Sequence, residues 1–177
     1  MVRKEEAMIL KVVKYPDPIL NKAASHVDRV TPVIARLMDD MVETMYANGG
    51  VGLAAPQVGI SKRVIVIDVG SELPDGTRAR SIIQMVNPDI ISSSGEIEWE
   101  EGCLSVPEFR LTLKRKVKIV VRGLDKKNKT VEIMADGLLS VAFQHEIDHI
   151  DGKLLIDRVS KKELKKYLKL IKKTAVL

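Results

Sequence analysis

Gln144-His145-Glu146-Ile147-Asp148-His149 is the stretch around which the rest of this chain is interpreted, because it matches the pattern HExxH. On an α-helix, residues four positions apart lie one above the other on the same face. His145 and His149 can therefore converge on one divalent cation, with Glu146 close enough to handle protons. The alternative is a pair of histidines on an ordinary polar helix face. The pattern favours a metal site.

The composition indicates one mainly aliphatic domain of 177 residues. Hydrophobic residues make up 45% of the chain but aromatic residues only 3%, which disfavours proteins that grip single-stranded nucleic acid by base stacking. The single cysteine cannot form an internal disulfide, which fits a reducing compartment. No apolar run reaches the roughly 18 residues that a membrane span needs, and the charged start Met1–Glu6 does not match a secretory signal peptide. We therefore expect a cytoplasmic protein that binds neither membranes nor DNA.

Hydrophobic periodicity and turn residues predict an α+β fold over residues 1–177, with antiparallel β-sheets packed around the helix that carries HExxH. An N-terminal helix should start at Thr31-Pro32 and end at Asn48-Gly49-Gly50, with its methionine stripe in the core. Gly50–Gln57 and Gly70–Arg80 read as loops, the first with backbone that approaches something closely. The expected strands are 8–15, 63–69, 82–86, 117–122 and 130–135. The motif helix should run over 137–150, with Asp136 as N-cap and Gly152 as its stop, and a basic helix over 160–177.

A catalytic site of this kind usually has three protein ligands and an open position for water, so a third ligand is needed. A longer zinc motif would place a histidine where Leu155 stands. A downstream helical glutamate has a candidate only in Glu163, within a lysine-rich tail, and His26 lies in a polar segment typical of the surface. Cys103 is left, since a thiolate binds borderline and soft divalent metals well. The alternative at this point is that Cys103 is simply a small buried hydrophobic residue.

Three motifs together resemble the signatures of the peptide deformylases, in the order and at about the spacing of that family. They are Gly50-Val51-Gly52-Leu53-Ala54-Ala55-Pro56-Gln57, Glu101-Gly102-Cys103-Leu104-Ser105 and Gln144-His145-Glu146-Ile147-Asp148-His149. The resemblance covers roughly residues 12–170, and the helical C-terminus resembles the shorter bacterial type. It implies a hydrolase that removes the N-formyl group from the initiator methionine of nascent polypeptides and releases formate.

The resemblance also implies roles for individual residues. Cys103, His145 and His149 would hold one divalent metal ion, with Fe²⁺ as the working ion and zinc as a tighter but poorer substitute, although the donor set also suits Ni²⁺ or Co²⁺. Glu146 would take a proton from the attacking water and pass it to the leaving amine. The Gln57 side chain and the Leu104 backbone N–H would stabilise the oxyanion.

Further residues are candidates for binding the substrate. Val51, Gly52 and Gly102 would offer backbone groups to an extended peptide. Leu138, Val141 and Ala142 precede His145 on the motif helix and would wall a methionine pocket, unless they only pack in the core. Two side chains stay open at this stage: Asp148 orients a ligand or lies exposed, and Arg110, like Arg115, pairs with the acidic run 96–101 or binds substrate.

The basic charge is concentrated in the C-terminal tail. Residues 160–177 contain seven lysines and one glutamate, a formal charge of +6, while the whole chain carries +5. An apolar stripe of Leu164, Leu168, Ile171 and Ala175 runs through these lysines. The stretch predicts either a solvated amphipathic helix packed on the body or a salt-sensitive contact with ribosomal RNA.

Two other functions are compatible with HExxH alone. A metallopeptidase would use the same carbonyl chemistry on internal peptide bonds. A non-catalytic module would use the metal only to hold the fold together, but structural zinc sites usually have four protein ligands, and Glu146 has no purpose in such a site.

Overall fold

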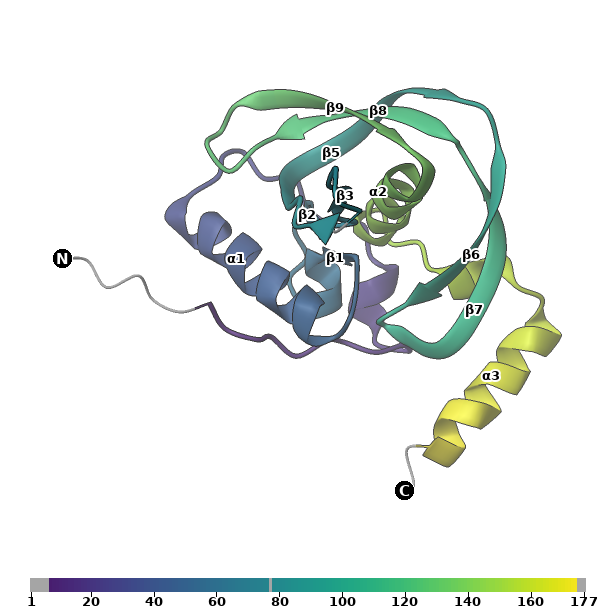
Figure 1. The fold of residues 1–177 in the computed structure, drawn as a ribbon. Coiled ribbons are helices and arrows are strands. Elements are labelled where there is room, and N and C mark those ends of the chain that lie inside the picture. Colours follow the sequence, from purple (N-terminus) through teal and green to yellow (C-terminus); the bar gives the residue numbers. More distant parts are fainter. Residues whose placement is uncertain (1–6, 77, 175–177) are drawn as a thin grey trace.

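The computed structural model describes residues 7–76 and 78–174, and its elements surround one central helix, α2 (Figure 1). Three α-helices and three short 3₁₀ helices are present in this part of the chain. They are α1 (Pro32–Ala47), α2 (Gly137–Ile150), α3 (Lys161–Thr174), η1 (Pro18–Asn21), η2 (Ala55–Val58) and η3 (Leu155–Arg158). None of the described helices combines the length and the apolarity needed to cross a bilayer.

The main sheet has five antiparallel strands in the order β1-β2-β5-β8-β9. A separate two-stranded sheet is formed by β6 and β7, and a second by the very short β3 and β4. The strands are β1 (Gly52–Ala54), β2 (Val64–Ile67), β3 (Ser71–Glu72), β4 (Arg78–Ala79), β5 (Ile83–Ser94), β6 (Ile97–Cys103), β7 (Val106–Arg115), β8 (Lys118–Leu124) and β9 (Thr130–Asp136). The predicted α+β class with antiparallel sheets around the motif helix is confirmed.

Strand β2 shows why the sheet is covered by a helix on each face. Successive side chains of a strand point to opposite faces, and all four residues of β2 are fully buried. Ile65 and Ile67 pack in the cluster that contains Phe143 and Ile150 of α2. Val64 and Val66 pack in a second cluster, with the predicted methionine stripe of α1, Met38, Met41 and Met45. An apolar sequence without polar alternation therefore places the sheet between α1 and α2.

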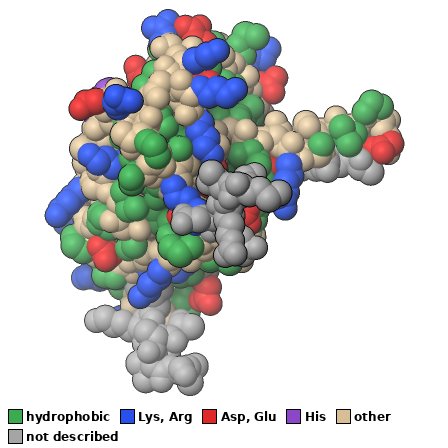
Figure 2. Space-filling view, turned by 90° about the vertical axis from the view of Figure 1, so that its left-hand side faces the viewer, with side chains coloured by type: hydrophobic (Ala, Val, Ile, Leu, Met, Phe, Trp, Pro, Cys, Tyr) green, Lys and Arg blue, Asp and Glu red, His purple; other side chains and the backbone are tan. Residues whose placement is uncertain are grey.

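Helix α1 forms as the sequence predicts. The Thr31 hydroxyl accepts a hydrogen bond from the Ile34 N–H at 3.3 Å, and Pro32 occupies the first turn, where its missing N–H costs nothing. Figure 2 shows the side of the molecule on which α1 lies, where basic and acidic side chains are interspersed with apolar ones.

The β6–β7 hairpin continues the β5–β8 ladder in the same register. Ser94 pairs with Lys118 and Ile97 pairs with Arg115, so two residues on each strand separate the two ladders. At this gap the Gln144 side chain makes two hydrogen bonds to the backbone, as a neighbouring strand would. Its carbonyl accepts from the Lys116 N–H at 2.9 Å, and its amide donates to the Lys116 carbonyl at 3.0 Å. Gln144, which precedes His145, thus ties α2 to the pair of long strands whose end carries Cys103.

Four predictions about local structure need correction. Residues 8–15 do not form a strand, because their N–H groups bond to acceptors outside any sheet: Met8 to the Asp40 carboxylate and Leu10 to the Thr44 hydroxyl, each at 2.8 Å. The expected loop 50–57 contains β1 and η2 and is buried from residue 53 to 57, since small side chains let its backbone pack closely.

The other two corrections concern strands. The expected loop 70–80 contains the short β3–β4 pair, although its turn at Pro74-Asp75-Gly76 is confirmed by a bond from the Gly76 N–H to the Leu73 carbonyl at 2.9 Å. The strand expected at 82–86 runs on to Ser94, because β8 pairs with it from Val86 onward. The β6–β7 hairpin was not predicted at all. Asp136 occupies the N-cap position of α2 but makes no capping bond through its side chain.

Gly152 ends α2 as predicted, and it also packs tightly. Its φ is +74°, and a Cβ at this position would stand 2.8 Å from the Lys22 carbonyl carbon and 2.9 Å from the Ala23 nitrogen. Backbone atoms cannot move aside as the end of a flexible side chain can. Glycine is therefore required both by the left-handed conformation and by the close approach of residues 22–23.

Gly152→Ala should destabilise the protein more than Gly49→Ala. Gly49 has φ +66° but open space around a Cβ, so alanine there incurs only the left-handed penalty of about 1–2 kcal/mol. Gly152→Ala adds a steric clash, typically about 1–3 kcal/mol. Urea midpoints of both variants measure the difference, and equal midpoints would show that the Gly152 contact is not tight.

Candidate metal centre

Three potential metal ligands converge between α2 and the end of β6. The Nε2 atoms of His145 and His149, one turn apart on α2, are 3.2 Å apart, and His149 Nε2 is 3.2 Å from Cys103 Sγ. The ligating atoms of all three residues lie within 4.8 Å of one another. Tetrahedral ligands at normal zinc distances would be about 3.3 Å apart for two nitrogens and about 3.6 Å for nitrogen and sulfur. The three residues therefore fit one divalent cation.

The electrostatics of the cluster also suit a cation. Burial raises the pKa of the Cys103 thiol, but the positive charge of His149 and hydrogen bonds with both histidines outweigh it and hold that pKa well below its usual range. Burial lowers the pKa of His145, while its bonds with Cys103 and Glu101 raise it well above the usual value. The cluster thus stabilises the thiolate, the form in which cysteine binds a metal, whereas His145 must release its proton before it can bind one.

Cys103 reaches this point because the hairpin changes register beside it. Cys103 pairs with Val106, leaving Leu104 and Ser105 as a two-residue turn, and a register shift separates this pair from Gly102 and Arg110. Gly102 and Cys103 are the last two residues of β6. The thiol therefore lies at the tip of the hairpin, where the hairpin meets α2.

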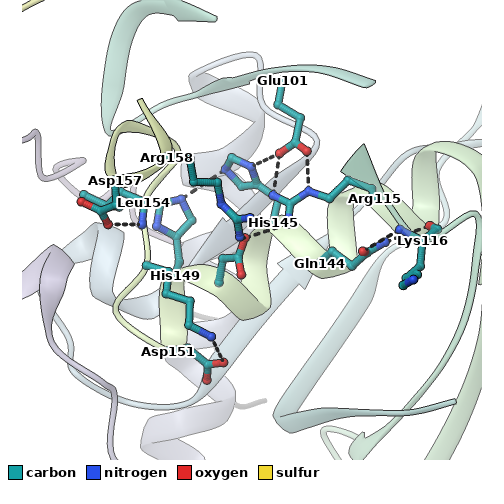
Figure 3. Close-up of polar contacts among 12 residues, drawn as sticks. Glu101, Arg115, Lys116, Gln144, His145, His149, Asp151, Leu154, Asp157 and Arg158 are labelled. Carbon is teal, nitrogen blue, oxygen red and sulfur yellow. Dashed lines mark hydrogen bonds and ion pairs between the residues drawn. The ribbon is translucent and has the colours of Figure 1, made fainter. Parts of the chain in front are cut away.

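A chain of buried charges orients His145 (Figure 3). The Nδ1 atom of His145 lies 2.8 Å from Glu101 Oε2, so a proton held there directs Nε2 toward the other ligands. Arg115 donates two hydrogen bonds to Glu101, at 2.5 and 3.0 Å, and a third to Asp148 at 2.7 Å. Burial raises the pKa of Glu101, but the bonds from His145 and Arg115 prevail and bring it to about 2.

This chain resolves two alternatives that the sequence left open. Asp148 is not simply an exposed carboxylate, because it accepts from Arg115 and, at 2.9 Å, from Arg158. Both arginines pair with the acidic run: Arg115 forms a buried pair with Glu101, and Arg110 forms an exposed pair with Glu100 at 3.8 Å. The contribution of Glu101 to His145 was not predicted, since the register that brings Glu101 and Arg115 together is not visible in one sequence.

Glu146 is buried next to the three ligands. Among the described residues, its Oε2 and the Nδ1 of His149 are the buried side-chain polar atoms without a hydrogen-bond partner. Burial raises the pKa of Glu146 to about 7, although the charges of His145 and His149 act in the opposite direction. A Cβ on Gly52 would stand 2.4 Å from Glu146 Oε1, so a larger residue would require the carboxylate to move from its present position.

The Gln57 amide faces the same centre from η2. Its Oε1 accepts from the Ala54 N–H at 2.8 Å, which leaves Nε2 to donate to the Ser105 hydroxyl at 3.2 Å and toward Cys103 Sγ at 3.7 Å. Gln57 is 1% exposed and Ser105 fully buried. The orientation of the amide is therefore held by the loop that contains it, and Ser105, which the sequence did not single out, completes its surroundings.

A cleft of about 690 Å³ opens onto these residues. Its walls come from the glycine-rich segment before β1, from the β6–β7 hairpin and from the first turns of α2. Residues predicted to take part in catalysis or binding make up most of its lining: Val51, Gly52, Gln57, Gly102, Cys103, Leu104, Arg110, Leu138, Val141, Ala142, His145 and Glu146. His149 is not in this lining and is 2% exposed.

The other candidates for a metal ligand lie elsewhere. His26 is exposed and contacts the Asn87 side chain at 3.2 Å, as expected of a surface residue. Glu163 accepts from the backbone and hydroxyl of Ser160 at 2.9 and 2.6 Å at the start of α3.

Val141 and Ala142 are buried and line the cleft, and Ala142 also packs in the α2 core cluster.

Comparison with known proteins identifies close relatives. Residues 9–165 match the polypeptide deformylase family. The chain is 50% identical over 158 residues to a peptide deformylase of Thermodesulfovibrio yellowstonii, covering 88% of this chain and 93% of that one. Its structure is similar to that of a peptide deformylase from Ehrlichia chaffeensis, with TM-score 0.87, 36% identity and 94% and 97% of the two chains covered. A Met-Ala-Ser-bound class I type b peptide deformylase from Acinetobacter baumannii matches with TM-score 0.78, 35% identity and 86% and 99% coverage.

Glu101→Gln should weaken metal binding about 10–100-fold, the usual cost of losing a partner that orients a metal-binding histidine. Competition with a chromophoric chelator for Zn²⁺ measures the change. Glu98→Gln, on the same strand but exposed, removes the same charge and should leave the affinity unchanged. Because Glu101→Gln leaves the buried Arg115 with only one of its two carboxylate partners, Asp148, and breaking a buried pair can cost about 3–5 kcal/mol, affinities are compared well below the unfolding temperature. Equal affinities of the two variants would contradict the proposed role of Glu101.

Proposed function

The chain belongs to the polypeptide deformylase family, and we propose that the centre formed by Cys103, His145 and His149 carries out that family's reaction. The reaction removes the N-formyl group from the formyl-methionine that starts new polypeptides and releases formate. The observation that supports this assignment best is the unpartnered, buried carboxylate oxygen of Glu146, which lies beside three converging ligands in an open cleft.

Cys103, His145 and His149 would hold one divalent cation, with Fe²⁺ as our proposed working ion and Zn²⁺, Ni²⁺ or Co²⁺ as substitutes. When bound, such a cation polarises the formyl carbonyl and lowers the pKa of a water. A thiolate ligand leaves the centre less positive than three histidines would. We therefore expect the reaction to depend strongly on its proton-handling residue.

Glu146 is that residue in our proposal. Its carboxylate accepts a proton from the water that attacks the formyl carbon, and then donates this proton to the nitrogen of the departing methionine. A base works best when its pKa lies near the working pH, and burial brings the pKa of Glu146 to about 7. Close packing by Gly52 keeps the carboxylate from turning away.

Gln57 and Leu104 would stabilise the oxyanion that forms on the formyl oxygen. Nε2 of Gln57 is a fixed donor because the Ala54 N–H holds the other end of the amide. The Leu104 N–H lies in the turn that follows Cys103, and Leu104 lines the cleft. Donors held in place before charge develops are worth about 10²–10³ in rate each.

The peptide would bind along the cleft as an added strand. Strand β1 is at the edge of the main sheet, and Val51, Gly52 and Gly102 line the cleft on its two sides, so backbone groups are available to an extended chain. Leu138, Val141 and Ala142 would wall the pocket for the methionine side chain. We place Arg110, exposed at the rim, against the peptide beyond the methionine.

Formate release from formyl-Met-Ala-Ser tests this proposal. The anaerobically prepared Fe²⁺ form should release formate faster than the Zn²⁺ form. Glu146→Gln should lower kcat by about 10²–10⁴, the usual contribution of a general base, with the metal retained. Glu98→Gln serves as the control and should match the parent. A Glu146→Gln enzyme with its metal and near-normal kcat would rule out this base.

We further propose that residues 1–177 form one metallohydrolase domain that works in the cytoplasm and touches the ribosome through its basic helix. Tyr167 of α3 is buried, its hydroxyl donates to the Pro107 carbonyl at 3.2 Å, and its ring lies 5.3 Å from that of Phe109. Leu164, one residue of the predicted apolar stripe, packs against the buried cluster that contains Tyr167. The side chains of residues 171–177, including Ile171, Lys172, Lys173 and Ala175, lie outside the described part.

Five lysines of α3 gather around one shallow surface hollow, which suits a phosphate backbone: Lys161, Lys162, Lys165, Lys166 and Lys169. Changing these five to glutamine should abolish salt-sensitive co-sedimentation with ribosomes, because each lost phosphate contact weakens binding and its salt dependence. The same change at five lysines of the body keeps the net charge equal and should leave co-sedimentation intact: Lys11, Lys22, Lys114, Lys118 and Lys127. Unchanged binding by the α3 variant would refute the ribosome contact.

A further inference from the structure

One short segment near the N-terminus contacts both loops that carry the proposed oxyanion donors. The Val13 N–H donates to the Gln57 carbonyl at 2.7 Å, and the Tyr15 N–H donates to the Ser105 carbonyl at 2.8 Å. Between them, the Lys14 ammonium donates to the Leu104 carbonyl at 2.5 Å. Three consecutive residues thus join η2 to the turn that follows Cys103.

These loops are also joined to each other, but through an atom that the reaction needs. Nε2 of Gln57 donates to the Ser105 hydroxyl at 3.2 Å and toward Cys103 Sγ at 3.7 Å. The amide has two N–H donors, so when one of them binds an oxyanion, at least one of these two contacts must lengthen or break. The contacts of residues 13–15 use none of the reacting groups and can persist throughout the reaction.

The Lys14 contact falls on the central peptide of the turn. Leu104 and Ser105 are the two residues between the paired Cys103 and Val106, so the peptide that joins them is the central peptide of the turn. Rotation of that peptide separates the common turn types. The Lys14 ammonium holds its carbonyl with a charge-assisted bond, roughly twice as strong as a neutral one. The bond thus fixes the Leu104–Ser105 peptide, and because this peptide begins at the Leu104 Cα, it also limits how far the preceding peptide, which carries the Leu104 N–H, can shift.

We propose that Lys14 is a positioning residue for deformylation. Together with the N–H groups of Val13 and Tyr15, it keeps the Leu104 N–H and the Gln57 amide aimed at one point while the oxyanion forms. This inference rests on the proposed function, in which Gln57 and Leu104 are the oxyanion donors. Lys14 is exposed and makes no contact with the substrate in this scheme.

Lys14→Met is the variant that tests the inference, because it keeps the side chain's length and removes its charge. We expect kcat on formyl-Met-Ala-Ser to fall about tenfold, since small misalignments of a reacting group are costly. KM should stay within about twofold, and the metal content and melting temperature should match the parent. Lys14→Arg, which can still donate to the Leu104 carbonyl, should recover most of the lost kcat. Lys11→Met, three residues away on the same exposed segment, should behave as the parent.

A double-variant cycle separates positioning from a general structural effect. In a Gln57→Ala background, Lys14→Met should cost less than about threefold in kcat, because one of the two donors to be aligned is already absent. A full tenfold loss in that background, or a kcat for Lys14→Met within twofold of the parent, would overturn the inference. A parent enzyme that releases no formate would instead contradict the proposed function, and this inference with it.

Discussion

The buried ion pair between Glu101 and Arg115 is the interaction on which the site depends. The β6–β7 hairpin shares no ladder with the five-stranded sheet, yet it carries Cys103, while both histidines lie on α2. Glu101 and Arg115 are 5% and 6% exposed, and buried charges are tolerated only when they are fully paired. Their remaining bonds go to His145 and Asp148 of α2. Satisfying the two charges therefore also fixes the hairpin against the helix.

Two neighbouring contacts support the same alignment. Gln144 bonds to the Lys116 backbone in the gap between the β5–β8 and β6–β7 ladders. The residue before His145 is therefore held by the strands that face α2. Asp148, before the second histidine, is held between Arg115 and Arg158. Each histidine is thus preceded by a side chain that ties α2 to another part of the chain. Because a connected set of hydrogen bonds orients Glu101, Arg115 and His145 together, the ligands are preorganised instead of being assembled by the metal alone.

The site also contains a buried carboxylate oxygen without a hydrogen-bond partner, which lowers the stability of the fold. An unpaired buried oxygen such as Glu146 Oε2 costs about 1–3 kcal/mol, and Gly52 gives up a side chain to let β1 approach it. The protein tolerates this cost because the rest of the core is well covered. Strand β2 is fully buried between α1 and α2. The buried sheet stabilises the fold, and the reactive carboxylate of Glu146 lies beside its edge strand β1.

The sequence by itself determined the parts that depend on local spacing. Helical or strand periodicity and turn chemistry predict the convergence of His145 and His149, the cap at Thr31, the methionine stripe of α1, the stop at Gly152 and the strands at 117–122 and 130–135. The motif resemblance indicated which residues would meet at the centre; the structure brings the ligating atoms of Cys103, His145 and His149 within 4.8 Å of one another and places Cys103 and His145, but not His149, in the lining of the cleft.

Only the tertiary structure decided the contacts made between distant segments. The β6–β7 hairpin, the pairing of Glu101 with Arg115, the bonds of Gln144 and the use of residues 8–15 as donors to loops and side chains depend on register and on partners tens of residues away. A strand pattern at 8–15 shows that the segment suits an extended backbone, but not which acceptors its N–H groups will find. Those acceptors, and with them the support of the site, exist only once the sheet, α2 and the hairpin are packed together.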